Sequence, residues 1–330
     1  MKFGLFVPQG WRLDLAGIAP ADQWRVMSDL ARAADVGPWE SIWVYDHFHT
    51  VPVPTDEATH EAWTLMAAFA AVTDRVRLGQ MCTCMAYRNP AYLAKVAATV
   101  DIVSGGRIEM GIGAGWYEHE WLAYGYGFPT AGARLGALDE GVQIFHQLWT
   151  TGTAKLHGKY YKVDGAICRP LPLQNGGIPM WIAGAGEQKT LRTAAKYAKY
   201  TNFAGSPEVF THKSEVLAQH CKDVGTDFDA ITRSSNFNVV IGETAKDVQD
   251  KLAWIRAHYE PFLDAERLAN LEKDFASGPL VGTPEQIVEK LRALRELGMK
   301  YAITYFSDAA YDRGSIDLFA SAVIPELASL

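Results

Sequence analysis

The sequence is poor in cysteine and contains no long apolar run. Four cysteines among 330 residues are too few for a fold held together by disulfides. The longest apolar run, near Leu65–Val72, is far shorter than the roughly 18 residues typical of a membrane-spanning helix. The first ten residues, MKFGLFVPQG, lack the apolar core of a secretory signal and are typical of a first strand. We therefore expect a cytoplasmic protein without a membrane partner.

Basic residues are not in excess either. The chain has 31 lysines and arginines against 38 aspartates and glutamates, a formal net charge of −7. Proteins that bind nucleic acid usually show the opposite balance, with positive charge gathered on one face. The sequence also lacks the Gly-x-x-x-x-Gly-Lys-Ser/Thr loop of NTPases and the Gly-x-Ser-x-Gly elbow of α/β-hydrolases. We expect a small-molecule substrate and no nucleic-acid partner.

Few side chains are spaced as metal ligands. His47 and His49 alternate after an apolar run, and alternate residues of a strand point the same way, so this pair could hold one ion. No His or Cys follows three of the later strands, and Cys82 and Cys84 have no second matching pair. We expect these cysteines to be small buried apolar residues, and the protein to hold no metal.

Short apolar runs alternate with amphipathic segments along the chain. Eight runs are typical of strands: Lys2–Pro8, Ser41–Tyr45, Arg75–Thr83, Arg107–Ile112, Pro179–Ala183, Tyr200–Ala204, Ser234–Ile241 and Tyr301–Phe306. The segments typical of helices are Ala21–Ala34, Glu61–Val72, Pro90–Val103, Arg134–Trp149, Glu187–Tyr197, Glu208–Val224, Ala245–Tyr259, Pro284–Leu297 and Ile316–Leu327.

Eight strands that are mostly each followed by a helix predict an α/β fold, the (β/α)8 TIM barrel. No linker rich in Pro, Gly or Ser divides the chain, so we expect one domain over residues 1–330. Two stretches do not fit the repeat and are expected to be loop insertions. One, at about 150–177, resembles a hairpin, and the other, at about 260–279, a helix.

Glycines gather at two predicted strand ends. Gly184, Ala185 and Gly186 end one strand directly before a predicted helix, and Gly111–Gly115 ends another. Small residues expose backbone N–H groups at a helix start, where the helix dipole favours an anion. Neither turn has a glycine at the last position of the dinucleotide fingerprint Gly-x-Gly-x-x-Gly. Together they indicate a cofactor that carries phosphate.

Carboxylates follow two of the strands. Asp46 stands at the carboxyl end of a strand, which is the catalytic face of a barrel. Glu118 and Glu120 follow Gly111–Gly115 in a stretch that we expect to be an exposed loop, so we interpret this pair as solvated.

Four segments resemble the bacterial-luciferase-like superfamily of barrels. They are Ser41–His49 with Asp-His, Arg75–Pro129 with Tyr-Arg-Asn-Pro, Ser-Gly-Gly-Arg and Gly-Ala-Gly-Trp, and then Pro179–Ala195 and Val281–Gly298, in the matching order. The similarity covers nearly the whole chain. It is closest to the actinobacterial oxidoreductases that depend on the deazaflavin coenzyme F420. The resemblance implies a luciferase-like barrel that holds a flavin or deazaflavin at the carboxyl ends of its strands, and a homodimer.

The resemblance also implies roles for particular residues. The third strand of this family ends in a bulge with a non-prolyl cis peptide behind the cofactor ring, which here would be Met81–Cys82, with Thr83 next to it. Asp46 would bond the pyrimidine edge of the ring, and His47 would lie near the reacting carbon as acid or base. The cofactor phosphate would rest on Gly184–Gly186.

These features predict an F420-dependent oxidoreductase that transfers a hydride between the deazaflavin and a small organic substrate. Sugar-phosphate dehydrogenases of the superfamily carry an acidic residue directly after the Gly-x-Gly turn, where this chain has Trp116. We therefore expect an apolar or aromatic substrate, near Trp11, Trp116, Tyr117 and Trp121. One alternative is an FMN-dependent monooxygenase served by a separate reductase. Another is a cofactor-binding or structural barrel without catalysis.

Overall fold

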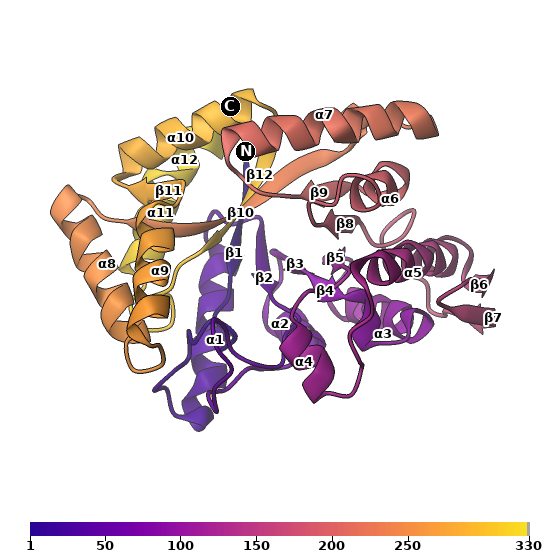
Figure 1. Ribbon diagram of the computed structural model, residues 1–330, viewed down its shortest axis with the longest axis horizontal. Helices are drawn as coiled ribbons and strands as arrows, with labels where there is room; N and C mark the ends of the chain where they lie inside the picture. Colours follow the sequence, from indigo (N-terminus) through magenta and orange to yellow (C-terminus); the bar gives the residue numbers. More distant parts are fainter. Residues whose placement is uncertain (329–330) are drawn as a thin grey trace.

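The computed structural model describes residues 1–328, and its centre is a closed barrel of parallel strands (Figure 1). Eight strands form the ring in this order: β1 (Lys2–Phe6), β2 (Ser41–Val44), β3 (Arg77–Gln80), β5 (Ile108–Gly113), β8 (Met180–Ala183), β9 (Tyr200–Asn202), β10 (Thr232–Ile241) and β12 (Met299–Tyr305). β12 pairs with β1, and β9 with β10, which closes the ring. The predicted (β/α)8 barrel and its eight strands are confirmed.

Helices surround this barrel. They are α1 (Pro20–Val36), α2 (Ala62–Val72), α3 (Pro90–Val103), α5 (Ala131–Thr151), α6 (Thr190–Tyr197), α7 (Pro207–Val224), α8 (Ala245–Tyr259), α10 (Pro284–Glu296), α11 (Gly314–Ala322) and α12 (Ile324–Ala328), with 3-10 turns at Met85–Tyr87 and Phe228–Ala230. None of the helices within residues 1–328 is long and apolar enough to cross a membrane.

Several helix ends differ from the predicted ones by one to three residues, and two helices differ in a way that affects the path of the chain. The last is split between α11 and α12, because Pro325 has no N–H with which to continue a regular ladder. α6 begins at Thr190 rather than at Glu187. The Glu187 carboxylate instead pairs with His212 and Lys213 of α7, outside the helix. The sequence suggested that the glycine turn leads directly into a helix. In the structure, residues 187–189 separate the turn from α6.

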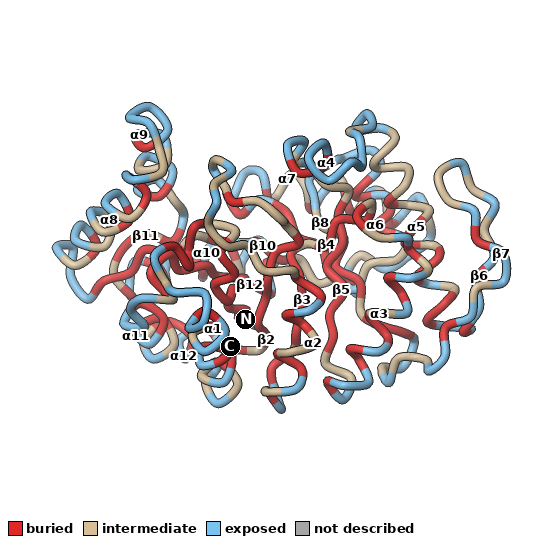
Figure 2. Tube along the Cα trace, turned by 90° about the horizontal axis from the view of Figure 1, so that it is seen from below, coloured by how far each residue is buried: buried red, intermediate tan, exposed pale blue. Residues whose placement is uncertain are grey.

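Both predicted insertions are present. β6 (Thr153–His157) and β7 (Lys162–Ile167) form an antiparallel hairpin, and α9 (Ala265–Ala276) fills the second insertion. Two further elements were not expected: β11 (Leu280–Gly282), which pairs with β10 in parallel, and α4 (Glu118–Ala123). Figure 2 shows α4 and α9 at the same end of the barrel. These helices border the face where the strands end.

Aromatic rings fill the inside of the barrel. Trp43 of β2 packs against Trp181 of β8 with ring centroids 4.7 Å apart, and Trp181 packs against Tyr301 of β12 at 4.9 Å. A Cβ atom at Gly4 or Gly79 would collide with the Trp43 ring, so these strands need glycine there. Because bulky side chains close the middle of the barrel, a ligand has access at its end.

Candidate functional site

The third strand of the barrel is interrupted at the face where we predicted the site. β3 ends at Gln80, the Met81–Cys82 peptide is cis, and β4 (Thr83–Cys84) continues the pairing with β5. The predicted cis peptide is confirmed at that bond. The Thr83 hydroxyl is buried and donates to the Gln80 side-chain oxygen at 2.7 Å. The sequence had suggested one continuous strand, Arg75–Thr83.

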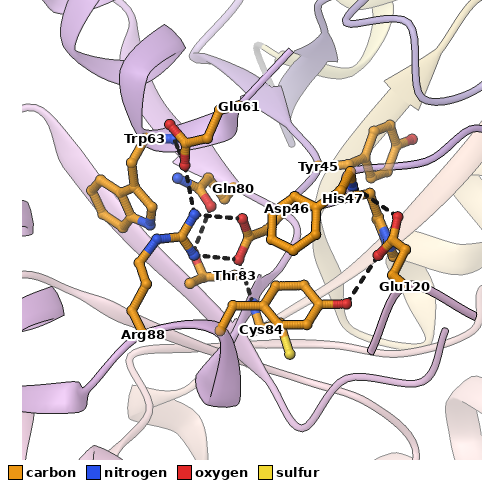
Figure 3. Close-up of polar contacts among 12 residues, drawn as sticks. Tyr45, Asp46, His47, Glu61, Trp63, Gln80, Thr83, Cys84, Arg88 and Glu120 are labelled. Carbon is orange, nitrogen blue, oxygen red and sulfur yellow. Dashed lines mark hydrogen bonds and ion pairs between the residues drawn. The ribbon is translucent and has the colours of Figure 1, made fainter. Parts of the chain in front are cut away.

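Asp46 is buried in an ion-pair network (Figure 3). Arg88 donates to both carboxylate oxygens, at 2.8 and 3.0 Å, and the Cys84 amide donates to Oδ2 at 2.8 Å. Arg88 also pairs with Glu61, the N-cap residue of α2. Asp46 therefore ties the interrupted strand to α2. Its contact with a cofactor stays a prediction.

His47 points away from Asp46, into an aromatic group of side chains. Trp11 stacks on the imidazole with ring centroids 4.1 Å apart and planes 2° from parallel. Trp116 and Tyr117 contact the same ring edge-on, at 5.8 and 6.0 Å. The side chain keeps 12% of its surface exposed. Three of the four aromatic residues singled out from the sequence thus surround His47. The fourth, Trp121, is buried against Tyr87 and Phe128.

Glu120 is the partner of His47, and the expectation that it is solvated is wrong. Its side chain is fully buried. Its carboxylate lies 2.8 Å from His47 Nδ1 and accepts from the amides of Phe48 and His49 at 2.8 Å and from the Tyr87 hydroxyl at 2.9 Å. Burial would raise the pKa of Glu120, but the hydrogen bond and charge of His47, followed by those two amides, lower it below its usual value.

A sequence signal for Glu120 existed. Tyr117, Glu120 and Trp121 are spaced three and four residues apart, as on one face of a helix. α4 indeed begins at Glu118 and turns Glu120 and Trp121 inward. Because an ionised carboxylate only accepts hydrogen bonds, the pairing assigns the Nδ1 proton to His47. Nε2 is then the nitrogen that can take or give a proton.

The glycine-rich strand ends line one hollow of about 320 Å³. Gly113–Trp116 and Ala183–Gly186 form its walls, with Cys82, Ala131, Arg134, Leu135 and Thr190. Gly184 has φ +121°, a conformation that side-chain-bearing residues rarely adopt. A Cβ at Gly113 would lie 2.6 Å from Cys82 Sγ, so glycine keeps this wall thin. The lining contains the cation Arg134 and no carboxylate. This composition suits the phosphate that the sequence indicated.

Cys82 and Cys84 remain thiols. Burial, followed by the nearby charge of Asp46, raises the pKa of Cys82 to about 12 and raises that of Cys84 as well. Both act as small apolar side chains, as expected. Among residues 1–328, no three His, Cys, Asp or Glu side chains are grouped so that they could hold a metal ion.

Comparisons with known proteins agree with this architecture. The family model for luciferase-like monooxygenases matches residues 1–301. The chain is 28% identical to the F420-dependent glucose-6-phosphate dehydrogenase of Nocardia farcinica, over 96% of this chain and 99% of that protein. It is 33% identical to the pyrimidine monooxygenase RutA of a Bradyrhizobium species, over 56% of this chain and only about half (51%) of that protein.

A solved structure shows the same fold. An F420-dependent secondary alcohol dehydrogenase, 21% identical, superposes with a TM-score of 0.79 over 99% of this chain and 98% of its own. The resemblance drawn from the sequence motifs is confirmed by the family match, which covers most of the chain. The chain therefore belongs to the luciferase-like monooxygenase family and is an oxidoreductase.

Proposed function

We propose that the protein is a coenzyme F420-dependent oxidoreductase that acts on a small organic substrate. The observation that carries the proposal is the His47–Glu120 pair, which stands at the same barrel face as the glycine-lined hollow. The relative in Nocardia farcinica, matched along nearly its whole length, is F420-dependent by name and supports this cofactor.

The residues proposed to bind the cofactor come from two strand ends. Met81, Cys82 and Thr83 would lie behind the ring, where the third strand is interrupted. Gly184–Gly186 would hold the phosphate in the glycine-lined hollow. When bound, the deazaflavin supplies hydride transfer, and the protein supplies binding and orientation. Asp46 is included in this set because its carboxylate accepts a hydrogen bond from the amide of Cys84, in the segment that follows the cis peptide.

His47 is proposed as the acid or base. The Glu120 carboxylate accepts a hydrogen bond from His47 Nδ1, and Trp11 covers one face of the imidazole ring. The orientation and tautomer of the imidazole are therefore fixed. Nε2 can then exchange a proton with the substrate oxygen or nitrogen that gains or loses charge as the hydride moves. A histidine suits this task near neutral pH.

The aromatic surroundings of His47 support an apolar or aromatic substrate. Trp11, Trp116 and Tyr117 present ring surface, and Trp116 is 61% exposed. No carboxylate stands directly after Gly113–Gly115, where sugar-phosphate dehydrogenases of the family place one. We therefore do not extend the sugar-phosphate substrate of the Nocardia relative to this chain.

An FMN-dependent monooxygenase with a separate reductase is the second candidate, which the similarity to a pyrimidine monooxygenase favours. Titration of the purified apoprotein with F420 and with FMN, followed by fluorescence, separates the two. We expect saturable F420 binding at least tenfold tighter than FMN binding. Tighter FMN binding would contradict the proposal, and binding of neither would favour the barrel without catalysis. The homodimer stays a prediction.

A further inference from the structure

A second hollow at the carboxyl end of the barrel has no role in the proposed hydride transfer. About 330 Å³ lies between the loops after β1 and β2, strand β10 and the insertion helix α9. Its polar and aromatic lining includes Arg12, Asn238, Tyr259, Arg267, Asp274 and Phe275. Tyr259 and Phe275 are buried. The hollow thus combines an aromatic wall with a cation.

Arg12 differs from Arg77 and Arg88, which have similar exposure, in that no carboxylate pairs with it. Arg77 pairs with Glu109, and Arg88 with Asp46 and Glu61. In residues 1–328 no carboxylate oxygen lies within 4.0 Å of the Arg12 guanidinium nitrogens. Buried arginines are rare unless they are paired, because an uncompensated charge is costly to remove from water. Among the same residues, Arg107 also has no carboxylate partner, but backbone carbonyls take up its donors, whereas Arg12 lines a hollow.

The contacts of Arg12 occupy the face of its guanidinium and only part of its edge. The group lies over the Tyr305 ring, 3.9 Å from the centroid, and 5.8 Å from that of Phe275. Nη1 donates to Asn238 Oδ1 at 2.7 Å. Guanidinium donors lie along the edge of a planar fork that matches a carboxylate. Asn238 and the Tyr45 hydroxyl take part of this edge, and the remaining donors are available to a ligand in the hollow.

We propose that this hollow, which we call the Arg12 pocket, binds the carboxylate of a planar organic acid, with the rest of the acid against its aromatic wall. The other charges of the lining are already paired or exposed. Arg267 donates to Asp264 of its own helix at 2.8 Å, and Asp274 is exposed. Arg12 is thus the cation that remains for the ligand.

The pocket adjoins the proposed catalytic residue along the chain. Trp11 stacks on His47, and the next residue, Arg12, lines the pocket. One loop therefore contacts both places. The idea that the bound acid is a substrate rests on the proposed function. The binding of an acid to Arg12 does not depend on the cofactor. A substrate with an aromatic body and a distant acid group would be held by both.

Calorimetric titration of the full-length protein with benzoate and benzamide tests the proposal. The two probes have the same shape and differ in charge. We expect benzoate to bind the wild type at least tenfold more tightly than benzamide. Equal binding of the two, or binding of neither, would overturn the proposal. Binding of inorganic phosphate in place of benzoate would also overturn it, since the pocket would then serve phosphorylated ligands.

Three variants locate the effect. Arg12→Gln should abolish the preference for benzoate, whereas Arg267→Gln in the same lining should keep it. Asn238→Asp retains Arg12 and its packing but supplies the missing carboxylate, so it should abolish the preference even if Arg12→Gln fails to fold. A preference unchanged in Asn238→Asp would refute the role of Arg12. F420 titration of the same variants is a separate readout, because a failed F420 titration bears on the proposed function and leaves the benzoate result intact.

Discussion

His47 Nδ1 lies 2.8 Å from Glu120 Oε2, although the two residues are 73 positions apart in the chain. The histidine lies in the loop directly after β2, and the carboxylate belongs to the short helix α4. The same carboxylate also accepts from the backbone amides of Phe48 and His49. Glu120 therefore fixes both the histidine ring and the loop that carries it.

His47→Ala should lower turnover by roughly 10²–10⁴-fold, the usual contribution of a positioned proton-transfer group. Cofactor affinity should stay nearly constant, since the change removes a proton-transfer group and leaves the glycine-lined hollow intact. His47→Asn retains much of the shape and a hydrogen bond, so it separates orientation from proton transfer. Steady-state rates and fluorescence titrations measure the two effects. Full activity in the Asn variant would make His47 an orienting residue only.

Glu120→Gln should destabilise the fold. The amide cannot accept from all of the donors that the carboxylate accepts, and hydrogen bonds to a charged group contribute about 1.5–3 kcal/mol. Glu118→Gln on the same helix is the matched control, because Glu118 is exposed whereas Glu120 is buried. Chemical denaturation of the three proteins measures the difference. Equal losses of stability in both variants would contradict the role assigned to Glu120.

The stabilisation by Glu120 should depend on pH. Its pKa in the folded protein is lowered, through the contacts with His47 and the two amides that outweigh burial. The ionised form is therefore favoured by folding, and its contribution is complete above the ordinary carboxyl pKa of about 4.3 and is lost as pH falls through the lower folded value. The difference in Tm between wild type and Glu120→Gln should be larger at about pH 6 than at about pH 3, because it shrinks below about pH 4. A difference that grows towards acid pH would contradict this sign.

The sequence predicted the barrel because its signals are local and repeated. Each strand is a short apolar run, such as Ser41–Tyr45, and each helix has its own periodicity, as in Pro90–Val103. The alternation of the two patterns along the chain is enough to predict the barrel. Boundaries were missed where a distant group decides them. Glu187 belongs to the predicted helix by its sequence pattern, but it lies outside α6 and its carboxylate pairs with His212 and Lys213 of α7.

The site was predicted less completely for the same reason. Family resemblance led to His47 and to the Met81–Cys82 peptide. Glu120 and Arg88 were missed, since each acquires its role only through long-range contacts, with His47 and with Asp46. A glutamate that follows a second glutamate and a histidine gives no local sign of burial unless its helical spacing from Tyr117 is recognised.

Gly184→Val should weaken cofactor binding by about 2–3 kcal/mol, comparable to one or two charge-assisted hydrogen bonds. Gly184 has φ +121° and lines the hollow, so a branched side chain there both strains the turn and fills the proposed phosphate site. Gly225→Val is the control, because Gly225 also has positive φ but ends α7 away from the hollow. Both variants should melt earlier, and only the first should bind cofactor more weakly in a fluorescence titration. Unchanged cofactor affinity in Gly184→Val would contradict the proposal that the cofactor phosphate binds at this turn.

Asp46 could serve the cofactor directly, by binding it or positioning the Met81–Thr83 segment, or only indirectly, by holding the fold together. Asp46→Ala leaves the Arg88 guanidinium without its bidentate partner in the interior, and breaking such a pair costs about 3–5 kcal/mol. Cofactor binding should weaken as well, because the Cys84 amide beside the cis peptide loses its acceptor.

The double variant Asp46→Ala with Arg88→Met removes both charges and should recover much of the lost stability, since packed apolar groups often replace a buried ion pair without net loss. If Asp46 binds the cofactor or positions the Met81–Thr83 segment, cofactor affinity stays low in the double variant although its Tm rises. Recovery of affinity together with Tm would show that Asp46 only holds the fold. Thermal melts and fluorescence titrations of the single and double variants, side by side, distinguish these outcomes.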